Sequence, residues 1–121
     1  MSRFRNSLEN ILTVYNMEKI LTVEQFTNFT QGEGLRIVKI GAGWCNPCRL
    51  IEQVFEEILP IDNVTVAEVD MDDAEEDIAV INNVRNIPTV LFYKDGLLID
   101  RFTGMIGREA IENKIKENLA K

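Results

Sequence analysis

The feature that most constrains the fold is the segment LRIVKIGAGWCNPCRL at 35–50, in which a β-branched run leads into two cysteines three positions apart. The β-branched run predicts a strand. After the cysteines, apolar residues recur at helical spacing until Pro60 stops the run; they are Leu50, Ile51, Val54, Phe55, Ile58 and Leu59. A strand that turns directly into an amphipathic helix indicates a chain in which strands and helices alternate.

The rest of the sequence continues this alternation. Further strands are predicted in MEKILT (17–22), VTVAEVDM (64–71), PTVLFY (88–93) and LLIDRF (97–102). Further helices are predicted in TVEQFTNFTQGEG (22–34), in DDAEEDIAVINNV (72–84) and in a closing segment with Ile111, Ile115 and Leu119 on one face.

Local signals fix how these elements begin and connect. Thr22 is the predicted N-cap of the first helix, and Gln25 completes a capping box with it. The pair Asp95 and Gly96 predicts a hairpin between the last two strands. Strands separated by helices pair in parallel through right-handed crossovers, and the hairpin adds antiparallel strands. We therefore predict an α/β protein, a three-layer α/β/α sandwich around a central mixed sheet.

The 121 residues suit one domain, which we place at 17–121. Residues 1–16 are a predicted N-terminal extension: it is either a short amphipathic helix or dispensable, because Met17 would serve as an alternative start. The extension contains no apolar stretch typical of a secretory signal, and no run approaches the ~20 residues of a membrane span. We expect a cytoplasmic protein without a membrane partner.

Composition excludes several classes of function. Thirteen basic residues stand against 20 acidic ones, a net charge of −7 that opposes binding to nucleic acid. The chain has no histidine, which excludes Cys/His catalysis, and its two cysteines fall short of the four ligands of a structural zinc site. A dinucleotide fingerprint is not supported, because Asn46 stands where the third glycine after Gly41 and Gly43 belongs. We expect these glycines to let the chain turn sharply into the helix.

The cysteine pair is open to three interpretations. A structural disulfide is weakened by its small loop, which removes little entropy from the unfolded chain, and by a reducing compartment. Two buried structural thiols remain an alternative. A reactive dithiol is favoured by the location, because unpaired N–H groups at a helix N-terminus stabilise a thiolate. Cys45 lies at the first turn and Cys48 about one turn further, and Pro47 fits between them. We predict that Cys45 attacks a disulfide and Cys48 resolves the mixed disulfide.

The segment WCNPC resembles the active site of the thioredoxin family, whose usual form has glycine where Asn46 stands. The resemblance covers about 17–121 and includes the segments NIPTV, YKDG and FTG. It implies a thioredoxin-like fold with a cis peptide bond before Pro88, where the alternative is a trans-proline at the start of a strand.

The resemblance also implies a mostly apolar docking surface made of Trp44, Ile87, Pro88 and Gly104. The backbone of Ile87 would pair with an extended substrate segment. Asn46 and Pro47 belong to the candidate substrate-binding residues as well. The alternative for Trp44 is a place in the core.

Two residues depart from the family pattern in a way that affects the chemistry. The family's buried aspartate beneath the second cysteine aligns with Lys39, and its lysine on the neighbouring strand aligns with Glu68. Lys39 has apolar neighbours and needs a partner, which Glu68 would supply, unless its side chain reaches solvent. Lys39 or Glu68 would then relay protons for Cys48. A charged Lys39 would favour the thiolate and make the couple more oxidising than a standard thioredoxin.

The resulting prediction is a thiol–disulfide oxidoreductase that reduces protein disulfides and binds no cofactor. By the resemblance, a flavin-dependent thioredoxin reductase is the expected electron donor, and the protein is expected to be a monomer. The alternatives are a more oxidising disulfide donor or isomerase, and a non-catalytic thioredoxin-fold module whose dithiol gates binding. The acidic run from Asp70 to Asp77 is interpreted as a solvated face.

Overall fold

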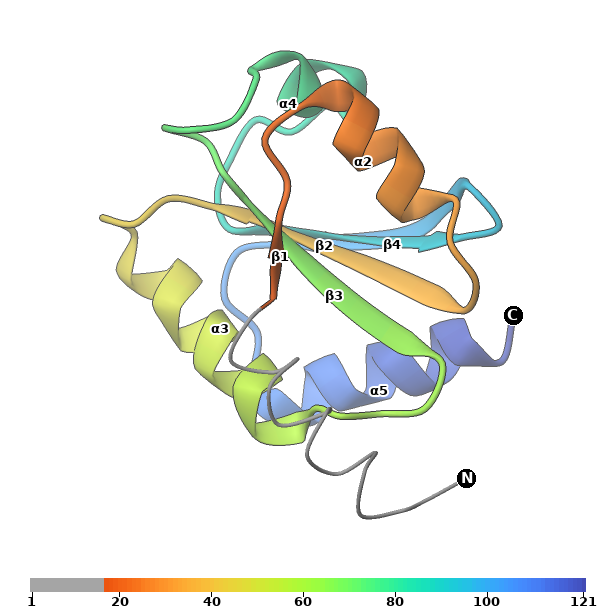
Figure 1. Ribbon diagram of the computed structural model, residues 1–121. Coiled ribbons are helices and arrows are strands. Elements are labelled where there is room, and N and C mark those ends of the chain that lie inside the picture. The colour runs from red at the N-terminus through yellow and green to blue at the C-terminus, as the bar shows by residue number, and fades with distance from the viewer. Residues whose placement is uncertain (1–16) are drawn as a thin grey trace.

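The computed structural model describes residues 17–121 (Figure 1). The predicted extension at 1–16 lies outside the described residues. The strands are β1 (Glu18–Lys19), β2 (Leu35–Gly41), β3 (Val64–Asp70), β4 (Thr89–Lys94) and β5 (Leu97–Thr103). The helices are α2 (Val23–Thr30), α3 (Asn46–Ile58), α4 (Asp77–Ile81) and α5 (Arg108–Leu119).

The five strands form one mixed sheet in the order β1-β3-β2-β4-β5. The pairs β1/β3 and β2/β3 are parallel, whereas β2/β4 and β4/β5 are antiparallel. Both parallel connections run through helices, and the last antiparallel pair is the predicted hairpin around Asp95 and Gly96. The prediction of a central mixed sheet is confirmed.

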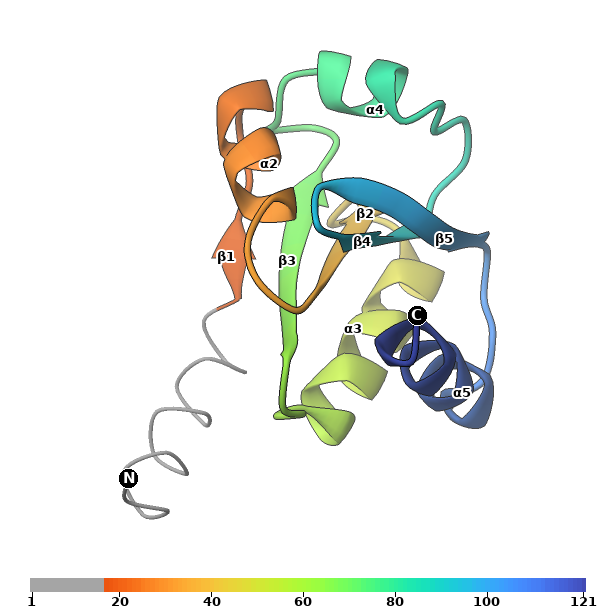
Figure 2. The ribbon, with the colours of Figure 1, turned by 90° about the vertical axis from the view of Figure 1, so that its right-hand side faces the viewer.

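Helices cover both faces of the sheet, which gives the predicted three layers (Figures 1 and 2). Helices α2 and α4 lie on one face, where Phe26, Phe29 and Ile78 belong to one hydrophobic cluster. Helices α3 and α5 lie on the other face, where Phe55 and Ile111 belong to a second cluster. Each face of the sheet therefore has its own core.

Strand β2 contributes to both cores, which explains its nearly continuous apolar sequence. Leu35 and Ile37 pack in the cluster with α3 and α5, while Val38 and Ile40 pack in the cluster with α2 and α4. Because side chains alternate along a strand, Lys39 is on the same face as Leu35 and Ile37. The strand thus places a lysine beneath α3, directly ahead of the cysteines.

All elements predicted within 17–121 are present, but two are clearly shorter than predicted. The strand predicted over 17–22 covers only Glu18–Lys19. The capping box of Thr22 and Gln25 forms as predicted. The helix predicted over 72–84 covers only Asp77–Ile81. Its acidic beginning forms turns instead, because the carbonyl of Asp70 accepts from the amides of Asp73 and Ala74. These bonds tie the chain to the end of β3 and delay the helix.

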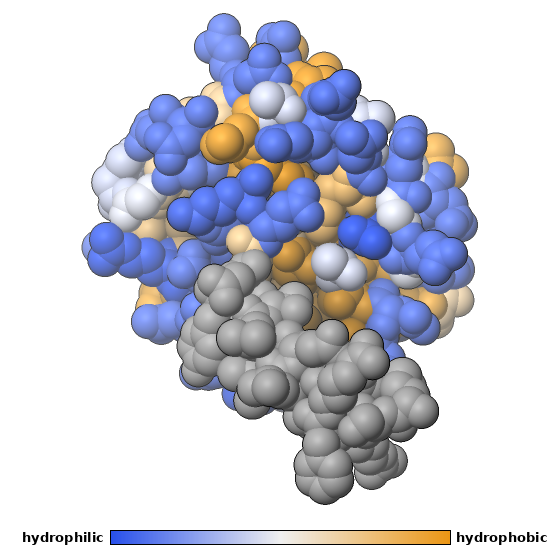
Figure 3. All heavy atoms as spheres, in the orientation of Figure 1, coloured by the Kyte–Doolittle hydropathy of each residue, from blue (hydrophilic) through white to orange (hydrophobic). Residues whose placement is uncertain are grey.

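From the side of Figure 1, hydrophilic side chains dominate the described surface, and hydrophobic atoms show between them (Figure 3). Within 17–121, none of the helices is both long enough and apolar enough to cross a membrane.

Candidate active site

The two cysteines lie at the junction between β2 and α3, as the sequence predicts. Cys45 is the N-cap of α3, and its Sγ accepts a hydrogen bond of 3.3 Å from the amide of Cys48. The two residues are joined by a disulfide, with Cα atoms 5.3 Å apart. Pro47 occupies the first turn of the helix. The amide that would stabilise a thiolate at Cys45 is therefore already directed at its sulfur.

The cysteines differ in exposure. In the disulfide form Cys45 is buried, with 6% of its surface exposed, whereas Cys48 is half-buried. Asn46 and Pro47, between them, are exposed. The role predicted for Cys45 is thus supported by its place at the helix N-terminus and its amide contact, not by a larger exposure.

Gly41 has a packing role that the sequence did not reveal. A Cβ at Gly41 would lie 2.8 Å from Sγ of Cys48, closer than real Cβ contacts allow. We predicted that Gly41 and Gly43 permit a sharp turn, but neither has a positive φ. Gly41 instead leaves room for the second cysteine against the sheet.

The peptide bond before Pro88 is cis, as the family resemblance implies. Pro88 is buried, Ile87 is half-buried, and the carbonyl of Pro88 accepts a 2.8 Å bond from the amide of Gly104. Gly104 has φ +87°, a conformation that favours glycine. Pro88 also lines a cavity with Cys48, so the structure brings the proline and the dithiol together.

Trp44 lies on the surface, with 70% of its area exposed. Its Nε1 donates a 3.0 Å hydrogen bond to Oδ2 of Asp72. The alternative that Trp44 belongs to the core is wrong. Sequence reasoning also missed Asp72, which holds the indole, and Met105, an exposed apolar residue directly after Gly104.

Lys39 is buried, with 9% of its side chain exposed, and forms ion pairs with two carboxylates. Its Nζ lies 3.6 Å from Oε2 of Glu68, its neighbour on β3, and 3.5 Å from Oε2 of Glu52 on α3. The predicted pair with Glu68 is confirmed, and the alternative that Lys39 reaches solvent is wrong. We call Lys39, Glu52 and Glu68 the Lys39 cluster. Glu52 was missed, although its position four residues after Cys48 puts it on the same side of the helix.

A cavity of about 290 Å³ connects the Lys39 cluster with the dithiol. Cys48 and Pro88 line it together with all three residues of the cluster. Exposed Gly43 and Arg49 also line the cavity, which therefore opens to solvent. In the described part of the chain, no group of three or more Cys, Asp or Glu side chains is arranged to hold a metal ion.

Comparisons with known proteins point to one family. The family model described as Thioredoxin matches residues 17–117. The chain is 34% identical over 107 residues to a thioredoxin of Coprinus comatus, covering 86% of this chain and 99% of that protein. It is 38% identical over 86 residues to a thioredoxin of Equus caballus, covering 70% and 80%.

Solved structures agree with the sequence relatives. Mitochondrial thioredoxin 3 of Saccharomyces cerevisiae in its oxidised form superposes with a TM-score of 0.78 at 25% identity, covering 87% of this chain and 98% of that one. A thioredoxin from Trypanosoma brucei brucei also gives 0.78 at 25% identity, covering 87% and 92%.

Proposed function

Since the chain belongs to the thioredoxin family and is a thiol–disulfide oxidoreductase with an active cysteine pair, we propose that it works as a reductase of protein disulfides. Cys45 attacks and Cys48 resolves. The observation that carries these roles is the Sγ of Cys45 at the N-cap of α3, where it accepts the amide of Cys48. This contact favours the thiolate at Cys45 over Cys48.

The reaction proceeds in two exchanges of thiolate for disulfide. The Cys45 thiolate attacks one sulfur of the substrate disulfide, forms a mixed disulfide and releases the other substrate sulfur as a thiolate. Cys48 then loses its proton and attacks Cys45, which closes the Cys45–Cys48 disulfide and releases the second substrate thiolate. The substrate gains two electrons and the protein loses two.

Substrate docks on the surface formed by Trp44, Ile87, Pro88 and Gly104. The half-buried Ile87 directly precedes Pro88, which lines the cavity of Cys48, and its backbone pairs with the substrate segment in this proposal. The bond from Gly104 to Pro88 supports this loop. The indole of Trp44, fixed by Asp72, supplies an apolar wall. Asn46 and Pro47 are exposed between the cysteines and contact the same substrate segment.

Lys39 and Glu68 tune this chemistry. A buried ammonium that lines the cavity of Cys48 stabilises the negative charge of the reduced form and so raises the reduction potential. Glu68 opposes this effect in part.

We place the protein in the cytoplasm as a monomer, with no bound cofactor. The chain's own electron carrier is the Cys45–Cys48 pair, which must be reduced again after each cycle. A thioredoxin reductase is the proposed donor, because the family works with such reductases.

Reduction of a disulfide-bonded protein substrate tests the proposal with Cys45→Ser and Cys48→Ser. Cys45→Ser is expected to abolish reduction, whereas Cys48→Ser is expected to accumulate a mixed disulfide through Cys45. Equilibration with a glutathione series, followed by the fluorescence of Trp44, gives the potential. Full activity in Cys45→Ser would contradict the assigned roles, and a potential far above the cytosolic glutathione value would contradict the reductase.

A further inference from the structure

We propose that Glu52 is the base that receives the proton of Cys48 when the mixed disulfide is resolved, with Lys39 as the residue that positions its carboxylate. This inference rests on the proposed function, because it concerns the step in which Cys48 attacks. Resolution requires a thiolate at Cys48, and an ordinary thiol with a pKa near 8.5 is mostly protonated at neutral pH. A base within reach of the thiol would remove this obstacle.

The positions of the charged side chains narrow the choice of base. Those that line the cavity of Cys48 are Lys39, Arg49, Glu52, Glu68 and Asp70. Lysine and arginine carry a proton already and cannot accept another in their charged forms. The base must therefore be one of the three carboxylates.

Glu52 is the only one of the three that lies on the same helix as Cys48. It follows Cys48 by one helical turn on α3, so the two Cβ atoms are about 5–6 Å apart on one helix face. Its side chain is 47% exposed, so a proton taken from Cys48 can pass on to solvent. Lys39 lies 3.5 Å from Oε2 and restrains the carboxylate at the cavity.

The other two carboxylates are less suited. The backbone of Gly41 lies directly against Sγ of Cys48. Glu68 is on the neighbouring strand, two residues before the position opposite Gly41, so its backbone is about 8 Å from that of Gly41. Asp70 is in register with Gly41 on β3, but its Oδ1 already accepts a 2.9 Å bond from the amide of Asp72. That bond holds the Asp70 side chain in the turn after β3.

The cavity supplies a path from the thiol to Glu52. At about 290 Å³ it has room for several water molecules of about 30 Å³ each. Water passes the proton of Cys48 to the carboxylate of Glu52. The electron pair left on Cys48 forms the bond to Cys45, and the bond from Cys45 to the substrate breaks with its pair on the substrate sulfur.

The test separates attack from resolution. Reduced protein mixed with Ellman's disulfide in a stopped-flow instrument releases one thionitrobenzoate on attack by Cys45 and a second on resolution by Cys48. Glu52→Gln is expected to slow only the second release, by about tenfold or more near pH 6. The deficit is expected to vanish near pH 9, where an ordinary thiol ionises without a base. A merely structural change would slow resolution at every pH.

Matched variants decide between the carboxylates. Glu56→Gln, on the same helix but away from the cavity, is expected to leave both releases unchanged. The assignment to Glu52 would be overturned if Glu68→Gln or Asp70→Asn, and not Glu52→Gln, slowed the second release in a pH-dependent way. It would also be overturned if the second release in Glu52→Gln were as fast as in wild type, or slowed equally at every pH. If wild type released no second thionitrobenzoate, the proposed role of Cys48 would fail as well, whereas failure of Glu52 alone leaves that role intact.

Discussion

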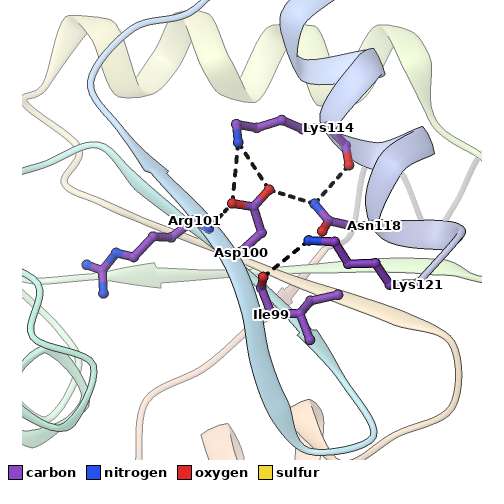
Figure 4. Close-up of polar contacts among 6 residues, drawn as sticks. All are labelled: Ile99, Asp100, Arg101, Lys114, Asn118 and Lys121. Carbon is purple, nitrogen blue, oxygen red and sulfur yellow. Dashed lines mark hydrogen bonds and ion pairs between the residues drawn. The ribbon is translucent and has the colours of Figure 1, made fainter.

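Two charged clusters lie on the same side of the sheet, and they are built in opposite ways. The Lys39 cluster lines the active-site cavity. A second one, the Asp100 cluster, joins Asp100 on β5 to Lys114 and Asn118 on α5 (Figure 4). Both clusters contain a lysine and at least one carboxylate in partly buried surroundings. They differ in how closely the charged groups are hydrogen-bonded.

The Asp100 cluster is tightly bonded. The carboxylate accepts from Asn118 Nδ2 at 2.9 Å, from Lys114 Nζ at 3.1 Å and from the amide of Arg101 at 2.8 Å (Figure 4). Burial raises the pKa of Asp100, but the hydrogen bonds from Asn118, Lys114 and Arg101 and the charge of Lys114 outweigh it, so the pKa lies below its usual value. This cluster fastens α5 to the sheet.

The Lys39 cluster is loosely bonded. Its two ion pairs, at 3.5 and 3.6 Å, are longer than the ~2.7–2.9 Å of a charge-assisted hydrogen bond. Both carboxylates border an open cavity. The Asp100 carboxylate is thus closely hydrogen-bonded, whereas the charges of the Lys39 cluster are less completely bonded and border the cavity of Cys48, which is why we propose the chemical roles for them given above.

The largest effect is expected from Asp100→Ala. It removes the carboxylate that accepts from the buried amide of Asn118, which keeps only its bond to the carbonyl of Lys114, and from the ammonium of Lys114. The loss is expected to lower the free energy of unfolding by about 2–4 kcal/mol. The reduction potential is expected to stay unchanged, because Asp100 does not line the active-site cavity. Urea denaturation measures the loss, with Glu117→Ala on the exposed face of α5 as the control. Equal stability of wild type and Asp100→Ala would show that the Asp100 cluster does not stabilise the fold.

The pH dependence of stability below neutrality gives a second test of the stabilising role of Asp100. Its pKa is lowered in the folded protein, so it contributes stability above its unfolded pKa of about 3.9, and this contribution is lost as pH falls through the lower folded value. Asp100→Asn removes the ionisation, and its stability is expected to fall less steeply than wild type below about pH 4–5, by a fraction of the Asp100→Ala loss. Thermal unfolding at a series of acidic pH values measures this. If the unfolding temperatures of wild type and Asp100→Asn fell equally steeply with pH, the result would contradict this role of Asp100.

Lys39→Met is expected to have the opposite effect to Asp100→Ala, a small loss of stability with a change in the reduction potential. Glu52 and Glu68 are partly exposed and can rehydrate, so the loss of stability is expected to stay at about 1 kcal/mol or less. Loss of the cation beside the sulfurs is expected to lower the potential by about 10–30 mV, measured against glutathione. The exchange Lys39→Asp with Glu68→Lys, which restores the family arrangement, is expected to lower it further. A potential that stayed constant in both variants would show that Lys39 does not tune the couple.

The Lys39 side of this contrast was largely predictable from the sequence, whereas the Asp100 cluster was not predicted. Lys39 stands out because its strand neighbours are apolar, so a buried ammonium with a partner in register could be inferred, and Glu68 is that partner. The dithiol at a strand-to-helix junction and the cis bond before Pro88 followed from the motif and the family resemblance. These features depend on residues that are close in sequence or occupy a recognised pattern.

The missed features depend on contacts between elements. Glu52 looks like any solvated glutamate on α3, and only the packing of this helix over β2 brings it to Lys39. The bond from Trp44 to Asp72 likewise joins two loops 28 residues apart in sequence. The short α4 results from turn bonds to Asp70, which override the helical pattern of the following residues. Local periodicity cannot foresee such tertiary contacts.

The smallest effect is expected from Glu57→Gln, which removes an exposed ion pair on the same helix as Glu52. Glu57 lies 3.3 Å from Arg108, closer than Glu52 lies to Lys39, but the two side chains are 61% and 53% exposed. Water and salt screen such a pair, so the loss of stability is expected to be at most about 0.5 kcal/mol and to vanish in high salt. Urea denaturation at two salt concentrations measures it. A loss as large as that of Asp100→Ala would mean that the charge separation alone sets the strength of these pairs. The expected small loss instead identifies burial and the three close hydrogen bonds to the Asp100 carboxylate as what distinguishes the Asp100 cluster.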